Sequence, residues 1–115
     1  MLVKQAAGFI KSEDFPVEAV EPGITRQILG YDSELMMVRV CFTKGAIGYV
    51  HKHVHRQVSF VEKGSFEVEI DGEKKVLKAG DGYFIPPNIL HGAVALEDAV
   101  LIDVFTPCRE DFLKP

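Results

Sequence analysis

The residue types best suited to chemistry gather in one short segment of the chain. Three of its four histidines, His51, His53 and His55, alternate with other residues just before Gln57, and the fourth is His91. Alternate residues of a β-strand project from the same face, so His51 and His53 are expected to lie side by side. Two such imidazoles and a third from a later strand form a nitrogen-rich site suited to a divalent transition metal. The alternative is a polar, solvent-facing strand that binds nothing.

The segments that must position these histidines have the pattern of β-strands. Short runs rich in β-branched and aromatic residues alternate with turns marked by Gly, Pro, Asp or Asn. The expected strands are Ile24–Tyr31, Leu35–Thr43, Val58–Lys63, Phe66–Ile70, Lys75–Leu77, Gly82–Ile85, Leu90–Ala95 and Ala99–Phe105. Asp71-Gly72, between two of these runs, predicts a two-residue hairpin turn. No run in this span has the 3.6-residue period of a helix, so the pattern indicates an all-β sandwich, jelly roll or closed barrel.

Glycines at fixed distances frame the histidine segment and the region of His91. The first frame is Gly45, His51, His53, Gln57 and Gly64, and the second is Gly80, Pro86, Asn88 and His91. This double frame resembles the two motifs of the cupin superfamily, with Gln57 in place of the usual Glu, Asn88 in place of Gly and Ala95 in place of Asn. Asn88 is a mild departure, because Asn tolerates the left-handed conformation of a turn glycine. The resemblance implies a jelly-roll β-barrel in which His51, His53, Gln57 and His91 bind one metal ion.

Gln57 is the most informative departure from the cupin pattern. Four neutral protein ligands would leave the ion with nearly its full double charge, so that it attracts anionic ligands such as a substrate carboxylate. The alternative is that Gln57 only hydrogen-bonds a ligand histidine. His55 is expected to lie behind the ligands or to face solvent. Zn, Ni, Fe, Mn and Co all suit such a site, and the sequence does not choose among them.

The last expected strand contains a carboxylate in apolar surroundings. Asp103 lies in the apolar run Leu101–Val104 and shares a strand face with Phe105. A lone buried carboxylate is costly unless it is paired or functional. Arg109 follows closely enough to fold back over the barrel mouth, which suggests a proton carrier, a sugar-stacking wall and a carboxylate clamp. A structural ion pair between Asp103 and Arg109, with Phe105 in the core, explains the pattern equally well.

A narrower resemblance runs from about Ile24 to Leu113. The matching segments are Ile28–Asp32, Leu35–Val38, Lys44–Ala46, the histidine run ending at Gln57, Asp103–Pro107 and Arg109–Phe112. They resemble the KdgF-type cupins of pectin and alginate breakdown, which convert 4,5-unsaturated monouronates released by polysaccharide lyases into linear keto forms. The resemblance implies a metal-dependent, isomerase-like enzyme with a small anionic sugar as substrate. Its active residues would be Asp103 as proton-shuttling acid and base, Phe105 as pocket wall and Arg109 as partner of the substrate carboxylate.

Two other functions are compatible with the cupin pattern, because the fold alone does not decide function. A three-histidine metal dioxygenase would consume O2 and prefer Fe²⁺, but Gln57 in place of Glu weakens that hypothesis. A non-catalytic cupin that binds sugars or carboxylates would form no product. It would be favoured if Asp103 and Arg109 paired away from the metal.

Composition and charge bound the remaining possibilities. The 115 residues predict one domain, with an N-terminal arm or edge strand over 1–23, a barrel over 24–106 and a tail with a short helical turn over 107–115. A net charge of −4 without a basic cluster argues against nucleic acid, and no stretch approaches the ~18 apolar residues of a membrane helix. Cys41 and Cys108 are expected to be reduced and at least partly buried in a cytoplasmic protein. Apolar residues on both faces of Val58–Val61 predict a homodimer.

Overall fold

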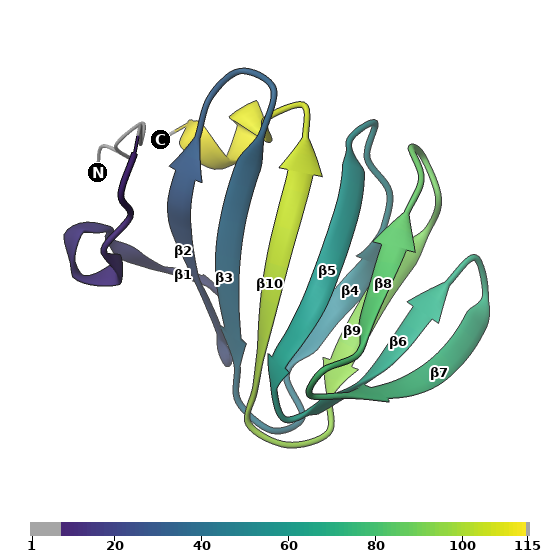
Figure 1. Cartoon of the computed structure of the whole chain (residues 1–115). Coiled ribbons are helices and arrows are strands. Elements are labelled where there is room, and N and C mark those ends of the chain that lie inside the picture. Colours follow the sequence, from purple (N-terminus) through teal and green to yellow (C-terminus); the bar gives the residue numbers. More distant parts are fainter. Residues whose placement is uncertain (1–7, 115) are drawn as a thin grey trace.

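The structure, a computed structural model, describes residues 8–114, which form ten β-strands and two short 3-10 helices (Figure 1). The strands are β1 (Val17–Glu21), β2 (Ile24–Tyr31), β3 (Met36–Phe42), β4 (Ile47–His51), β5 (Arg56–Lys63), β6 (Ser65–Ile70), β7 (Glu73–Lys78), β8 (Gly82–Ile85), β9 (His91–Ala95) and β10 (Ala99–Thr106). The 3-10 helices are η1 (Ser12–Asp14) and η2 (Glu110–Leu113), and η2 lies within the expected tail.

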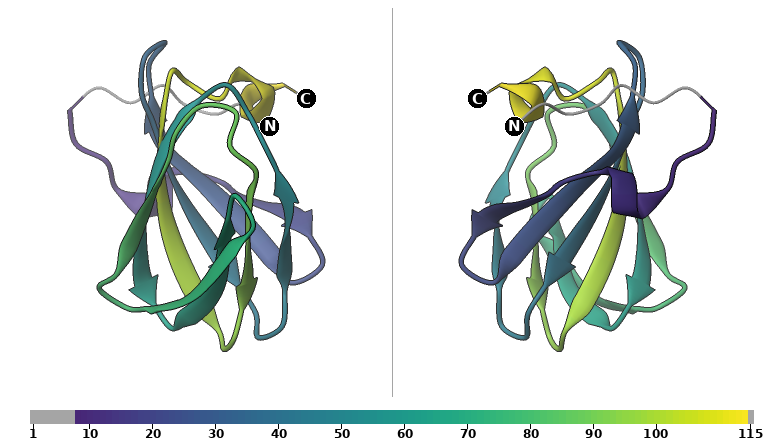
Figure 2. Two further views of the ribbon diagram at one scale, coloured as in Figure 1. Left: turned by 90° about the vertical axis from the view of Figure 1, so that its right-hand side faces the viewer. Right: turned by 90° about the vertical axis from the view of Figure 1, so that its left-hand side faces the viewer.

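The strands form two antiparallel sheets that face each other. One sheet has the order β1-β2-β3-β10-β5-β8, and the other has the order β4-β9-β6-β7. Figure 2 shows the two layers from the side. The chain passes from one sheet to the other at six connections: β3–β4, β4–β5, β5–β6, β7–β8, β8–β9 and β9–β10. This arrangement is a jelly roll, and it confirms the expected all-β fold class.

All eight expected strands are present, and each ends within two residues of its predicted bounds. The predicted hairpin is confirmed, since Asp71 and Gly72 have φ of 50° and 83°, as a turn with two left-handed residues requires. β1 lies in the expected N-terminal arm and pairs with β2 at the sheet edge. β4 lies outside the expected set because all of its residues except Gly48 are exposed, so the strand lacks apolar alternation.

Side chains that point between the sheets form the core and part of a polar site. β5 and β10 alternate buried and less buried residues, so one face of each strand lines the interior. One apolar cluster includes Phe42 and Phe66, whose rings meet edge-on with centroids 5.0 Å apart, and a second includes Met36 and Phe105. Among the residues that the structure describes, four polar side chains are buried with them: Gln57, Ser59, His91 and Asp103. Buried polar groups in such a core need partners or a function.

The two cysteines lie apart and are both free thiols. Cys108 is buried, but Cys41 is exposed, so the expectation that Cys41 is at least partly buried is wrong. The reason is its position on β3, where Val38 and Phe42 point inward and Cys41 points outward. Within residues 8–114, no helix is long and apolar enough to cross a membrane.

Candidate metal centre

Three histidines converge between the sheets, as their spacing predicted. His51 is the last residue of β4 and pairs in register with His91, the first residue of β9. The ring centroids lie 4.5 Å apart for His51 and His91, 4.8 Å for His53 and His91, and 5.5 Å for His51 and His53. One ligand atom from each ring lies within 4.8 Å of the others, close enough to bind a single ion.

The route by which His53 reaches this cluster differs from the prediction. β4 ends at His51, so His53 does not share a strand face with it and lies in the following loop. The backbone N–H of Asn88 donates to the His53 carbonyl at 2.7 Å and holds this loop. Asn88 has φ of 63°, the left-handed conformation expected at this motif position. The second motif therefore fixes the loop that presents the second histidine.

The three clustered histidines share one hydrogen-bonding arrangement. The Nδ1 atom of each ring lies within hydrogen-bond distance of the backbone carbonyl two residues away: Tyr49 for His51 (2.8 Å), His55 for His53 (3.0 Å) and Ile89 for His91 (2.9 Å). A carbonyl oxygen only accepts, so each Nδ1 carries the proton and each Nε2 keeps its lone pair. This is the tautomer that a metal needs. His55 takes part through its carbonyl, and its own ring lies outside the cluster.

His91 gives the most direct sign that the cluster fits a metal ion. Its Nε2 atom is buried and has no hydrogen-bond partner. Burial lowers the pKa of His91 to about 4, and burial with the nearby Arg109 charge lowers the pKa of His53. Both rings are therefore neutral near physiological pH. A buried lone pair without a partner is unfavourable, and a divalent cation would satisfy it.

Gln57 lies beside the histidine cluster on β5. Its Oε1 atom is 3.0 Å from Nε2 of His53, and both atoms are acceptors if His53 carries its proton on Nδ1. Two acceptors facing each other at this distance suit two ligands of one cation. The Gln57 amide N–H donates to Oγ of Ser59 at 2.9 Å, which turns the amide oxygen toward the histidines.

Ser59 and Tyr83 belong to the site although no motif singled them out. Ser59 Oγ donates to Oδ1 of Asp103 at 2.5 Å, so Ser59 links Gln57 to Asp103. Ser59 alternates with Gln57 on β5, and this shared parity is the signal that could have found it. Tyr83 pairs in register with Ser59, and it lines a cavity together with Gln57 and Asp103. Burial, with the neighbouring Asp103 charge, raises the pKa of Tyr83.

Asp103 is a buried acid on the inner face of β10. Leu101, Asp103 and Phe105 all point inward, and Asp103 is 9% exposed. Burial raises the pKa of Asp103 to about 6, while the Ser59 hydrogen bond and the Arg109 charge act in the opposite direction. A carboxyl group with such a pKa can both give and take a proton near neutral pH.

Arg109 folds over the mouth of the barrel, where it pairs with Asp111 and not with Asp103. Its Nε and Nη2 atoms donate to the two carboxylate oxygens of Asp111 at 2.9 and 2.8 Å. Its guanidinium lies 5.1 Å from the ring centroid of Phe105 and 4.2 Å from that of Phe112. The alternative ion pair between Asp103 and Arg109 is therefore not formed.

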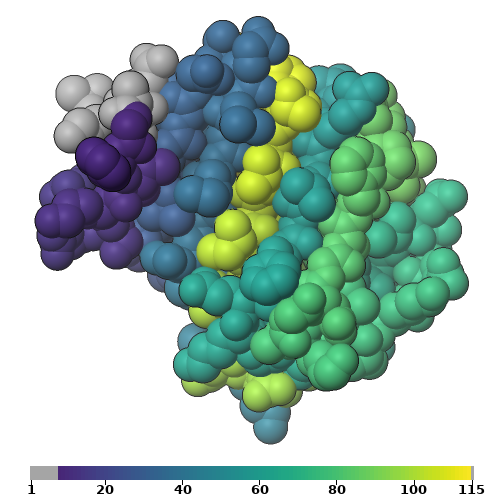
Figure 3. Space-filling model, viewed as in Figure 1, coloured from purple at the N-terminus to yellow at the C-terminus, as the bar shows by residue number. Residues whose placement is uncertain are grey.

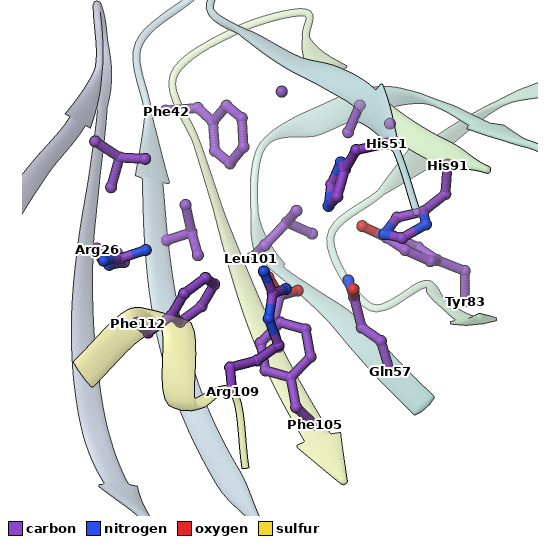
Figure 4. Close-up of a pocket in the computed structure, with 16 residues that line it drawn as sticks. Arg26, Phe42, His51, Gln57, Tyr83, His91, Leu101, Phe105, Arg109 and Phe112 are labelled. Atoms are coloured by element: carbon purple, nitrogen blue, oxygen red, sulfur yellow. The ribbon is translucent and has the colours of Figure 1, made fainter. Parts of the chain in front are cut away.

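One cavity of about 150 Å³ lies between the two apolar clusters. Its lining includes most of the side chains described above: His51, Gln57, Tyr83, His91, Asp103, Phe105 and Arg109. Figure 4 shows His51, His91 and Gln57 on one side, Arg109 toward the middle, and Arg26 with Phe112 on the other side. The volume is well below the roughly 300–1,000 Å³ of pockets for drug-sized ligands. The cavity therefore suits one small polar molecule next to an ion.

The order of strands and the histidine site have counterparts among known proteins. The family model for the cupin domain matches residues 38–105. The chain belongs to the cupin family. This cupin is 52% identical over 103 residues to the pectin degradation protein KdgF of Dickeya dadantii, a match that covers 88% of this chain and 94% of the relative.

Solved structures give the same result for this cupin. An RmlC-like cupin from Shewanella frigidimarina is 50% identical, with a TM-score of 0.90 over 94% of this chain and 97% of that chain. KdgF from Halomonas sp. is 44% identical, with a TM-score of 0.89 over 94% of this chain and 100% of that chain. The resemblance to KdgF-type cupins is thereby confirmed.

Proposed function

We propose that this cupin is a metal-dependent enzyme that converts 4,5-unsaturated monouronates into linear keto-deoxyuronates. The observation that carries the proposal is a chain of polar groups: Gln57 lies beside His53 and donates to Ser59, and Ser59 donates to the buried acid Asp103. Gln57 and Asp103 line one cavity with His51 and His91. Two relatives support the proposal by name, since both are called KdgF and one is described as a pectin degradation protein.

We assign the metal to the Nε2 atoms of His51, His53 and His91 and to Oε1 of Gln57. The fit rests on the donor set: the imidazole tautomers leave Nε2 free, and His91 Nε2 is buried without a partner. The bound ion would supply a Lewis acid that attracts the substrate carboxylate and stabilises negative charge developing on the neighbouring oxygen. Zn, Ni, Fe, Mn and Co are all compatible with this donor set.

The proposed reaction is an isomerisation, so the substrate keeps all its atoms. The C1–O5 bond of the cyclic hemiacetal breaks, the C1 hydroxyl loses its proton to become an aldehyde, and O5 remains as an enol. The enol becomes the C5 ketone when C4 gains a proton and O5 loses one. We assign these proton transfers to Asp103, whose pKa of about 6 suits both directions. Ser59 holds the carboxyl group in one orientation through Oδ1.

Arg109 and Phe105 complete the proposed site. Two of the five guanidinium N–H groups of Arg109 are used by Asp111, which fixes the plane of the group and leaves further donors for a ligand. We assign these donors to the substrate carboxylate, which guanidinium groups bind well. Phe105 lies beneath the guanidinium and forms a wall of the cavity. The small cavity volume favours a monosaccharide over a longer fragment.

The proposal is tested by incubating the protein with lyase-generated unsaturated monouronate and following the loss of the C=C absorbance. We expect rapid loss, abolished by a chelator and restored by adding one divalent metal. The absence of any chelator-sensitive acceleration would contradict the proposal. Oxygen consumption in the same assay would instead support a dioxygenase, and saturable binding without product would support a sugar-binding cupin.

We also propose that the protein is a homodimer. Val58, Phe60 and Phe84 on the outer face of β5 and β8 are 47%, 49% and 57% exposed. Val58 pairs in register with Phe84 on one side and Val104 on the other, so these side chains form one continuous apolar patch. Figure 3 views the molecule from the direction of Figure 1, with the β10, β5 and β8 segments (yellow, teal and green) at its surface. Exposed apolar patches of this kind mark interfaces.

Light scattering at micromolar concentration is expected to give twice the 12.8 kDa chain mass. The double variant Phe60→Glu, Phe84→Glu should give the monomer mass, because it places charge inside the proposed contact. Val76→Glu, at a side chain 64% exposed on β7, is the control and should remain dimeric. A monomer mass for the unmodified protein would contradict the proposal.

We further propose a cytoplasmic location. The free thiols of Cys41 and Cys108 support it, because thiols persist in reducing compartments. The proposed substrate is a monosaccharide, a molecule small enough to be taken up after the polymer has been cut.

A further inference from the structure

A second basic residue points into the cavity from the side opposite the histidines. Arg26 lies on β2 between Ile24 and Ile28, which are 5% and 1% exposed, so its parity places it on the inner face. It lines the same cavity as His51 and Asp103. An arginine at an inward position is unfavourable unless its donors are used.

The hydrogen-bonding capacity of Arg26 is only partly used by the protein. Its Nη2 atom contacts Oε2 of Glu18 at 3.6 Å, too long for a good hydrogen bond. Its Nε atom is buried with no hydrogen-bond partner, and Oε1 of Glu18 is buried without one too. Buried polar atoms in native proteins are nearly always paired, and an unpaired one calls for an explanation. A ligand in the cavity provides one.

The orientation of Arg26 is fixed although its donors are not saturated. Its guanidinium lies 4.0 Å from the centroid of the Phe112 ring, and Arg109 lies 4.2 Å from the same centroid. Phe112 therefore contacts both cations, an arrangement stabilised by cation–π attraction. Stacking holds the plane of the Arg26 guanidinium, so the group loses little further freedom when it binds a ligand.

The cavity thus has two polar ends. Figure 4 shows Arg26 and Phe112 across the cavity from His51 and His91, with Arg109 between them. A ligand that fills the cavity must present a metal-binding group at one end and hydrogen-bond acceptors at the other. A monouronate has this layout, with its carboxylate at C6 and hydroxyl groups at C2 and C3.

We propose that Arg26 donates hydrogen bonds to the sugar hydroxyl groups at C2 and C3 and thereby determines which monouronate the enzyme prefers. This inference rests on the proposed function. Unsaturated monouronates from pectin and from alginate share their reacting atoms, C1, O5, C4 and C5, as well as the C6 carboxylate, and differ in configuration at C2. A fixed, planar donor reaching C2 and C3 would bind one epimer better than the other.

The test compares kcat/KM for the two unsaturated monouronates in Arg26→Met, which keeps much of the apolar stem and removes every donor. We expect at least about a tenfold loss for the preferred epimer, the usual effect of removing a charged hydrogen bond, and a smaller loss for the other. The ratio between the two substrates should therefore move toward one. Arg39→Met is the matched control, because Arg39 lies on the outer face of β3, where it contacts Glu62 at 3.5 Å. Its ratio should equal that of the unmodified enzyme.

An unchanged substrate ratio in folded Arg26→Met would overturn the inference while leaving the proposed function intact. If Arg26→Met fails to fold, Arg26→Lys carries the test, since lysine keeps the charge but loses the planar fork. The ratio should again move toward one, and an unchanged ratio would again overturn the inference.

If the unmodified protein shows no turnover, the proposed function fails. The role of Arg26 is then tested by calorimetric titration with galacturonate, which lacks the C4–C5 double bond. Binding weakened about tenfold in the Arg26 variant, but not in Arg39→Met, supports the site. Equal binding in both variants, or none in the unmodified protein, overturns it.

Discussion

Replacing Asp103 by asparagine is expected to lower turnover of unsaturated monouronate by about 10²- to 10⁴-fold, the usual contribution of a positioned acid or base. Asparagine has nearly the shape of aspartate and keeps the oxygen that accepts the Ser59 hydrogen bond, so Ser59 and Gln57 should stay in place. Asp103 does not belong to the group of side chains that could hold the metal, so metal content should be unchanged. Steady-state rates and metal analysis of the purified variant measure both quantities.

The same substitution is expected to make the metal-free protein more stable at neutral pH. Burial raises the pKa of Asp103 from 3.8 to about 6, so the folded protein binds this proton more tightly than the unfolded chain. The stability that this group contributes is complete below about pH 4 and is lost as the pH rises through about 6. Above that range the charged carboxylate is buried at a cost that asparagine avoids, on the order of 1–3 kcal/mol. Urea unfolding with chelator, at about pH 7.5 and about pH 4, should show the gain only at the higher pH.

Asp71→Asn is the matched control for both measurements. Asp71 lies in the exposed hairpin with φ of 50°, a conformation that asparagine tolerates, so activity and stability should not change. Full turnover in Asp103→Asn would remove the proton-carrying role. If Asp103→Asn and the unmodified protein had equal free energies of unfolding at both pH values, the carboxyl group would not be charged and buried as the structure places it.

The strands were predictable where one face is buried and the other is not. β10 alternates along its whole length, and its bounds differ from the prediction by a single residue. β4 was not predictable, because it exposes Tyr49 and Val50 in succession and offers no apolar alternation. Its place beside β9 depends on Gly92, where a Cβ atom would lie 2.8 Å from the Gly48 carbonyl oxygen. That close approach is a property of the folded pair of strands and leaves no local pattern.

The histidine part of the site was predictable because its residues fall in the two glycine-framed motifs. The resemblance of these motifs to those of cupins was enough to place His91 with His51 and His53. It could not reveal that Ser59 bonds Asp103, because that contact depends on the pairing of β5 with β10, 44 residues apart. Arg26 was missed for a similar reason: a single arginine in a strand resembles a surface charge until the neighbouring strands show which face is inside.

Replacing His91 by alanine is expected to remove the metal and with it the activity. His91 is the buried member of the cluster, and its Nε2 atom has no partner other than the proposed ion. Loss of residues that merely support metal ligands costs roughly 10–100-fold in metal affinity, so loss of a ligand should cost more than that. Metal analysis after dialysis should find one equivalent per chain in the unmodified protein and almost none in His91→Ala.

Thermal unfolding gives a second measurement of the same site that does not depend on catalysis. A ligand that binds only the folded state stabilises it, by about 4 kcal/mol when its concentration is a thousand times its dissociation constant. Added metal should therefore raise the Tm of the unmodified protein and leave that of His91→Ala unchanged. His55→Ala is the matched control, because it removes an imidazole from the same motif but keeps the carbonyl that orients His53. It should retain both the metal and the Tm increase, and a metal-dependent Tm increase in His91→Ala as large as in the control would contradict the assigned centre.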